Sequence, residues 1–146
     1  MAKTLRNERG TALIEAAITI PILLLIGVGL FEFGRAYQHS QILTNAAREG
    51  ARLAVLPGST SAAVEQRVRD YMRDGGLPNY ASDTVTVSVN RGAKMPVNGV
   101  DVPASEITIS YPFDFMLLAP VAKLVNPNST TGGPKTLSIK ALMRNE

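Results

Sequence analysis

An unbroken apolar stretch near the N-terminus constrains this chain more than any other feature. Residues 11–31 carry one charge, Glu15, and residues 20–31 read Ile, Pro, Ile, Leu, Leu, Leu, Ile, Gly, Val, Gly, Leu and Phe. The stretch is about as long as the roughly 20 residues with which a helix crosses a hydrocarbon core of about 30 Å. The sequence therefore predicts a transmembrane helix over residues 11–33, after a short leader over residues 1–10.

A cleaved secretory signal is the alternative interpretation of this stretch. Such signals have an apolar core of about 7–15 residues, followed by a small-residue cleavage site such as Ala-x-Ala. Here the apolar run is longer, and the chain continues through residues 32–37 without such a site. We therefore expect the segment to stay in the membrane as a single-pass anchor.

The excess positive charge lies in the leader. The net charge is +3, from 15 basic and 12 acidic residues, and the first ten residues hold Lys3, Arg6, Arg9 and Glu8. The rest of the chain therefore has 12 basic and 11 acidic groups, which leaves no basic surface for phosphate and argues against a nucleic-acid partner. Basic residues ahead of a membrane helix keep the N-terminus cytoplasmic and place the chain after residue 33 across the membrane.

Helical periodicity continues beyond the membrane segment. Over residues 34–56, apolar side chains recur at three- and four-residue steps without a proline, and Pro57-Gly58 then provides a stop. A second helix is predicted between the cap candidates Ser59, Thr60 and Ser61 and the breaker Gly75-Gly76. Its predicted apolar face consists of Val64, Val68, Tyr71 and Met72.

The remainder of the chain alternates with a period of two, which is the pattern of strands with one buried face. Three such runs occupy residues 84–89, 106–111 and 137–143. Residues 91–105 and 126–135 are rich in Gly, Pro, Asn and Thr, so we expect surface loops there. Residues 115–125 are apolar but contain a proline, and the pattern assigns no element to them.

The predicted fold class is α+β and pilin-like. A long N-terminal transmembrane helix extends over residues 34–56 into a small domain over residues 59–146, which holds a second helix and a three-stranded antiparallel sheet. A domain of this size is marginal on core area alone. We therefore expect one face of the sheet to pack on the second half of the long helix.

The chain lacks the residue sets that catalysis and metal binding need. It has no cysteine, and His39 is its single histidine, so no imidazole pair or thiolate can share a metal. No serine nucleophile elbow, phosphate loop or paired acid–base spacing occurs. We therefore predict a protein that is not an enzyme, with no cofactor, metal or small-molecule substrate, and with His39 as an interfacial polar residue.

The junction of leader and helix carries the most functional information. A charged leader ends in Gly10, and Glu15 stands at the fifth position of the apolar helix. A carboxylate in lipid needs a cationic partner, and cutting after Gly10 would create one, the new α-amino group of Thr11. The alternative is that Glu15 snorkels to the cytoplasmic interface beside Arg9.

This junction resembles the processing site of type IV prepilins. In that family a dedicated prepilin peptidase cuts after the glycine, and the glutamate pairs with the new N-terminus of a neighbouring subunit. The resemblance thus implies leader cleavage between Gly10 and Thr11 and a role in subunit assembly for Glu15. Family sites often place an aromatic residue after the glutamate, where this chain has Ala16.

The N-terminal region as a whole is similar to that of TadE-like proteins, the pseudopilins or minor pilins of the tight-adherence (Tad, Flp-type) pilus machinery. The similarity is carried by residues 9–17, Pro21, residues 31–36 and residues 46–52. It implies a structural or assembly subunit in the bacterial inner membrane, with a periplasmic C-terminal domain. The implied partners are the membrane, other pilin-like subunits, the pilus assembly platform and the peptidase. The alternative is a permanently anchored periplasmic adaptor or binding module that never enters a filament.

Four residues of the membrane helix and its exit are candidates for helix packing: Pro21, Gly27, Gly29 and Gly34. Glycine lets neighbouring helices approach closely, and proline can kink a helix. The alternative is that both residue types are simply tolerated in lipid.

Four polar residues of the helix extension form a candidate interaction face: Asn45, Arg48, Glu49 and Arg52. This face either contacts a neighbouring subunit or is solvated. In the second case Glu49 is expected to pair with Arg52, three residues on.

Overall fold

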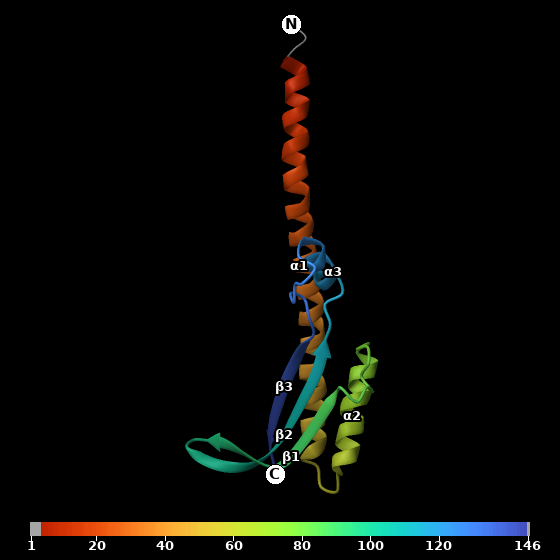
Figure 1. The fold of residues 1–146 in the computed structure, drawn as a ribbon. Coiled ribbons are helices and arrows are strands. Elements are labelled where there is room, and N and C mark those ends of the chain that lie inside the picture. Colours follow the sequence, from red (N-terminus) through yellow and green to blue (C-terminus); the bar gives the residue numbers. More distant parts are fainter. Residues whose placement is uncertain (1–3, 146) are drawn as a thin grey trace. The chain divides into compact units, whose positions relative to one another are not determined.

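The computed structural model describes residues 4–145, and the first three residues of the predicted leader lie outside the described residues (Figure 1). The chain is divided into two compact units. The N-terminal unit comprises Met1–Arg35 and Phe115–Gly132, and the sheet unit comprises Ala36–Asp114 and Gly133–Glu146. The elements in chain order are α1 (Thr4–Ala54), α2 (Ser61–Asp74), β1 (Thr86–Val97), β2 (Val100–Phe113), α3 (Leu118–Val125) and β3 (Lys135–Arg144). The predicted α+β class, with its long N-terminal helix, second helix and three-stranded antiparallel sheet, is confirmed.

Helix α1 is continuous over 51 residues and includes Pro21. It ends at Ala54, two residues before the predicted end at Leu56. The Leu56 N–H donates to the Leu53 carbonyl at 3.1 Å, which closes a tighter final turn. The residue before a proline is disfavoured in the helical region, so the helix stops ahead of Pro57.

Helix α2 begins and ends at the predicted residues. Thr60 is its N-cap, and the Thr60 hydroxyl accepts a hydrogen bond from the Ala63 N–H at 3.2 Å. Gly76, with φ +76°, ends it in a left-handed conformation that glycine adopts without strain. The buried side chains are Val64, Val68 and Met72. The prediction for Tyr71 is wrong: its side chain is 37% exposed, because the buried stripe advances in steps of four residues and bypasses it.

The sheet has the order β1-β2-β3 and is antiparallel throughout. Ile109 of β2 stands opposite Val87 of β1 and Ile139 of β3. Alternation along central strand β2 puts four side chains on the buried face: Ile107, Ile109, Tyr111 and Phe113. The three predicted strand runs are thereby confirmed.

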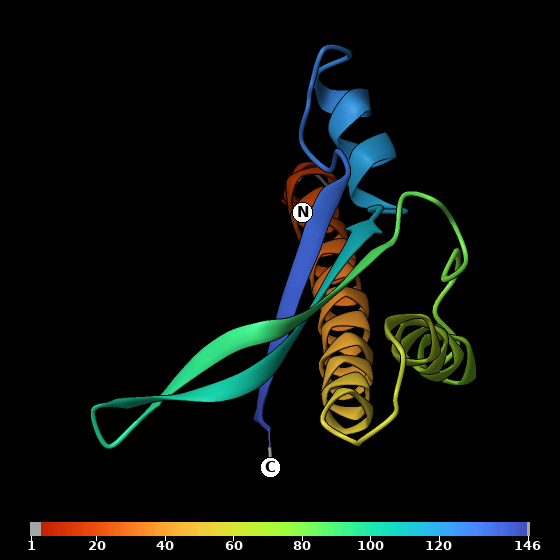
Figure 2. The same cartoon turned by 90° about the horizontal axis from the view of Figure 1, so that it is seen from below.

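The loop predicted over residues 91–105 is wrong, because this segment forms a β-hairpin. Asn98 and Gly99 have φ values of +51° and +81°, and Val97 pairs with Val100 across them. Two consecutive positive φ values define the type I′ turn that Asn-Gly favours. Strand β3 pairs with β2 only from Ala104 onward, so the tip of the hairpin is a two-stranded ribbon beyond the third strand (Figure 2).

The core of the sheet unit lies between the second half of α1, helix α2 and the sheet. Helix α1 contributes Leu43 and four small residues, Ala46, Ala47, Ala51 and Ala54, all at most 3% exposed. A Cβ added at Gly50 would lie 2.4 Å from Cγ2 of Val68, so α1 and α2 approach too closely there for any side chain. The predicted packing of the sheet on the long helix is confirmed.

The apolar segment left unassigned by the sequence forms α3. Pro120 is its third residue, and a proline is tolerated in a first turn because the N–H it lacks would have no partner within the helix. The segment between α3 and β3 contains no helix or strand, as predicted for residues 126–135, although Lys135 already belongs to β3.

Candidate functional site

The first half of α1 is largely exposed from Gly10 onward. Its leucines and isoleucines from Leu13 to Leu30, together with Phe31, keep between 52% and 72% of their surface accessible. This is the one helix among the described residues that is long and apolar enough to cross a membrane. So much apolar surface is unfavourable in water, so a bilayer or neighbouring subunits have to cover it.

The predicted processing and assembly residues lie on this exposed helix. Gly10, Thr11 and Glu15 are all exposed, and helix α1 runs through the bond between the first two. The Glu15 carboxylate is therefore accessible to a partner outside the described chain. Cleavage after Gly10 and the assembly role of Glu15 both stay predictions.

The packing candidates lie on α1 without close neighbours inside the chain. Gly27, Gly29 and Gly34 have no heavy atom within 4 Å of a position where a Cβ would stand, apart from their own surroundings on the helix. Pro21 lies within the continuous helix. Packing at these residues therefore requires another molecule, and their role stays a prediction.

Glu32 is a site residue that the sequence analysis missed. It is 1% exposed, although it stands between the exposed residues Phe31 and Phe33. One carboxylate oxygen accepts a hydrogen bond from the Arg35 guanidinium at 2.9 Å. The other oxygen accepts hydrogen bonds from the backbone N–H groups of Leu117 and Leu118, at the start of α3. A negative charge at a helix N-terminus stabilises the helix, so Glu32 holds the start of α3 against α1 within the N-terminal unit.

The predicted pair of Glu49 with Arg52 is replaced by a cross-helix pair. Glu49 accepts two hydrogen bonds from Arg67 of α2, at 2.9 Å and 3.3 Å. This hydrogen bonding, together with the negative charge of Glu49, raises the pKa of Arg67 above its usual value. The pair bridges the two helices close to Gly50, where a Cβ would meet Val68.

Two recesses of about 440 Å³ each adjoin this pair along the seam between α1 and α2. The first is lined by Ile42, Asn45, Arg67, Tyr71, Asp74 and Gly75. The second is lined by Glu49, Arg52, Leu53, Leu56 and Arg67. The structure thus brings Asn45, Glu49 and Arg52 to one seam, whereas Arg48 is exposed and lines neither recess.

Residues 10–52 match the model of the family described as TadE-like protein. We refer to this matched segment of the chain as the TadE-like domain. The resemblance inferred from the sequence is thereby confirmed. Comparison with curated proteins and with solved structures gives no match.

The TadE-like domain coincides with nearly all of α1 downstream of the leader. It covers the exposed apolar half and the predicted assembly residue Glu15, and it ends at Arg52, two residues before α1 does. Glu32, Ile42, Asn45, Glu49 and Arg52 lie within it. Helices α2 and α3 and the sheet lie outside the match.

His39 lies within the TadE-like domain and contacts the sheet. Its ring stands edge-on to Tyr111 and Phe113, with ring centroids 5.8 Å and 5.3 Å apart and interplanar angles of 81° and 83°. Such edge-to-face geometry is favourable for aromatic rings. His39 therefore packs on the aromatic end of β2, rather than serving only as a polar residue at an interface.

Proposed function

We propose that this protein is a membrane-anchored, pilin-like structural or assembly subunit of a Tad (Flp-type) pilus. The observation that carries the proposal is the combination of a TadE-like domain with a helix whose first half is apolar and exposed. In the proposed arrangement the anchor spans the bacterial inner membrane with its N-terminus in the cytoplasm and the sheet unit in the periplasm. The protein has a structural role and catalyses no reaction.

Assembly depends, in this proposal, on the charge at Glu15. A prepilin peptidase cuts after Gly10, and the α-amino group of Thr11 then pairs with Glu15 of a neighbouring subunit. A carboxylate about one turn into lipid is costly without a cation nearby, by about 2.5–3.5 kcal/mol at the centre of a membrane helix. An intersubunit pair removes that cost only when the two helices are in register, so the pair also sets their stagger.

The experiment compares Glu15→Gln with Glu15→Asp in cells that carry the complete pilus system. Gln keeps the size and the hydrogen bonding but removes the charge, so we expect normal abundance in the membrane fraction and a loss of intersubunit cross-links and of pili. Asp keeps the carboxylate and should retain a large part of both. Intact mass of the wild-type protein from native membranes should correspond to a chain that begins at Thr11.

A permanently anchored periplasmic adaptor is the second candidate, favoured by Ala16 at the position where processing sites often have an aromatic residue. An adaptor has no need to lose its leader. Full-length mass in cells with an active peptidase, together with normal cross-linking of Glu15→Gln, would replace the pilin proposal with this one.

A further inference from the structure

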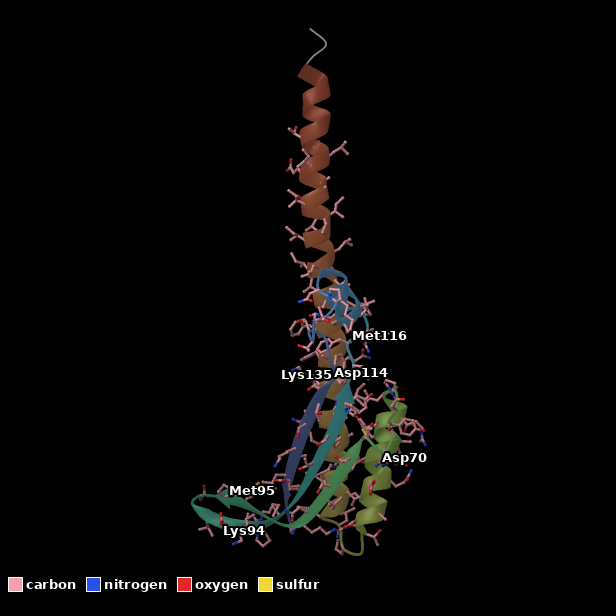
Figure 3. All side chains as sticks on the ribbon, in the orientation of Figure 1. Asp70, Lys94, Met95, Asp114, Met116 and Lys135 are labelled. Atoms are coloured by element: carbon pink, nitrogen blue, oxygen red, sulfur yellow. The ribbon has the colours of Figure 1, made fainter. Side chains whose placement is uncertain are left out.

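The two residues before helix α3 expose large apolar side chains that the N-terminal unit does not cover. Met116, labelled in Figure 3, is 64% exposed, and Leu117 is 41% exposed. The helix itself reads Leu-Ala-Pro-Val-Ala-Lys-Leu-Val, with Lys123 as its single charged residue. Two exposed apolar side chains beside a largely apolar helix are unfavourable in water.

The position of Glu32 along α1 indicates how deep in a bilayer this surface would lie. Residues 15 and 32 are 17 positions apart on one helix, which corresponds to about 26 Å at about 1.5 Å per residue. If Glu15 lies near one boundary of a hydrocarbon core of about 30 Å, Glu32 lies near the other. The hydrogen bonds from Leu117 and Leu118 to Glu32 bring the start of α3 to that same level.

The environment of Glu32 fits this depth. Its neighbours Leu30, Phe31 and Phe33 are 71%, 52% and 78% exposed, whereas the carboxylate is almost completely covered. A charge at a lipid boundary is tolerated when it is paired and its hydrogen bonds are satisfied. Arg35 and the two amides of α3 provide both, so α3 shields from lipid the one acid in this part of the helix.

We infer that helix α3, with Met116 and Leu117 before it, forms a second membrane contact that lies at the bilayer surface at the Glu32 end of the span. Met116 and Leu117 face the acyl chains, and Lys123 lies among anionic headgroups, as in other amphipathic interfacial helices. The occupant is lipid because this surface belongs to the same unit as the exposed apolar side chains of α1. The inference rests on the proposed membrane anchoring.

Fluorescence of single-cysteine variants tests this inference, since the chain has no cysteine of its own. The full-length protein is reconstituted in vesicles of phosphatidylcholine and phosphatidylglycerol with a polarity-sensitive label at Met116→Cys or Leu117→Cys. Leu23→Cys reports the middle of the span, and Lys94→Cys, on the exposed ribbon labelled in Figure 3, reports water. We expect blue-shifted emission at 116 and 117, quenched by lipids that carry a nitroxide near the headgroup and protected from iodide.

The outcomes separate the two proposals. Lipid quenching at 23 with iodide quenching at 116 and 117 equal to that at 94 would overturn the interfacial helix and leave the anchor standing. Protection at 116 and 117 that disappears on dilution of protein in lipid would mean that a second copy is the occupant, which also overturns it. Iodide access at 23 would overturn the membrane anchor, and this inference with it.

Discussion

The two halves of α1 show how one helix meets two different surroundings. The first half presents large leucines and isoleucines, 52–72% exposed, and no other part of the described chain covers them. The second half presents Ala46, Ala47, Gly50, Ala51 and Ala54, which are buried against the sheet and α2. The second half also carries charged residues on its outer face, which residues 16–31 of the first half lack. On its buried face the apolar side chains are mostly small.

The difference has a physical cause. Lipid chains are fluid and fill the space around large branched side chains, so bulk on the membrane half costs nothing in packing. The sheet unit has to bring α1 close to α2 and to three strands, and small residues permit that close approach. The TadE-like domain contains most of both halves, so it combines a segment apolar enough to span a membrane with the covering helix of a small domain.

The largest expected effect comes from removing the second half of α1. A fragment of residues 34–146 should be soluble and folded as an α+β domain, whereas a fragment of residues 59–146 should aggregate. The second fragment exposes Ile107, Ile109 and Tyr111, which are at most 2% exposed in the intact protein. Size-exclusion chromatography and circular dichroism measure the difference. Equal solubility and equal unfolding midpoints would show that α1 does not stabilise the sheet.

A smaller but well-defined effect is expected from one added methyl group. In Gly50→Ala the new Cβ meets Val68, and overpacking of this kind typically costs about 1–3 kcal/mol. The matched control is Gly27→Ala, which has open space around it and should leave the unfolding of the sheet unit unchanged. Urea unfolding of the full-length protein in mild detergent, monitored by tyrosine circular dichroism, gives both values.

A second variant tests whether contact with Val68 causes this loss of stability. Val68→Ala removes the Cγ2 atom that the new methyl group would strike. The double variant Gly50→Ala/Val68→Ala should therefore be more stable than the sum of the two single changes implies, since contacting residues couple. Additive free energies of unfolding would mean that the close approach of α1 and α2 is not what the methyl group disturbs.

Local patterns in the sequence are sufficient to predict most of the helices and strands. The Thr60 cap, the glycines after α2 and the alternation of the three strands each act within a few residues, so they could be identified without a structure. The two-stranded ribbon at the tip of the β1–β2 hairpin was not predicted. Pro96 and Pro103 favour a loop, but both lie where no third strand needs their missing N–H, and Asn98-Gly99 between them forms the hairpin turn.

The site residues were harder to predict because their partners are distant in sequence. Glu32 binds amides 85 and 86 residues away, and no local spacing indicates that contact. Glu49 had a plausible partner three residues on, yet it pairs with Arg67, 18 residues on, once α2 folds against α1. The proposed role of Glu15 depends on a second molecule, so its test is a cross-link between subunits.

The smallest expected effect concerns the cross-helix pair of Glu49 and Arg67, at the edge of the buried half of α1. The Arg67 side chain is 55% exposed and that of Glu49 is 30% exposed, so water and salt screen their attraction. Glu49→Gln should lower the unfolding midpoint less than Gly50→Ala does. This decrease in the midpoint should vanish at high salt. A double-mutant cycle with Arg67→Gln isolates the coupling, which should be favourable at low salt only. Coupling absent at every salt concentration would show that the pair does not hold α2 to α1. Glu49 would then return, with Asn45 and Arg52, to the candidate face for a neighbouring subunit, where cross-linking rather than unfolding reports the change.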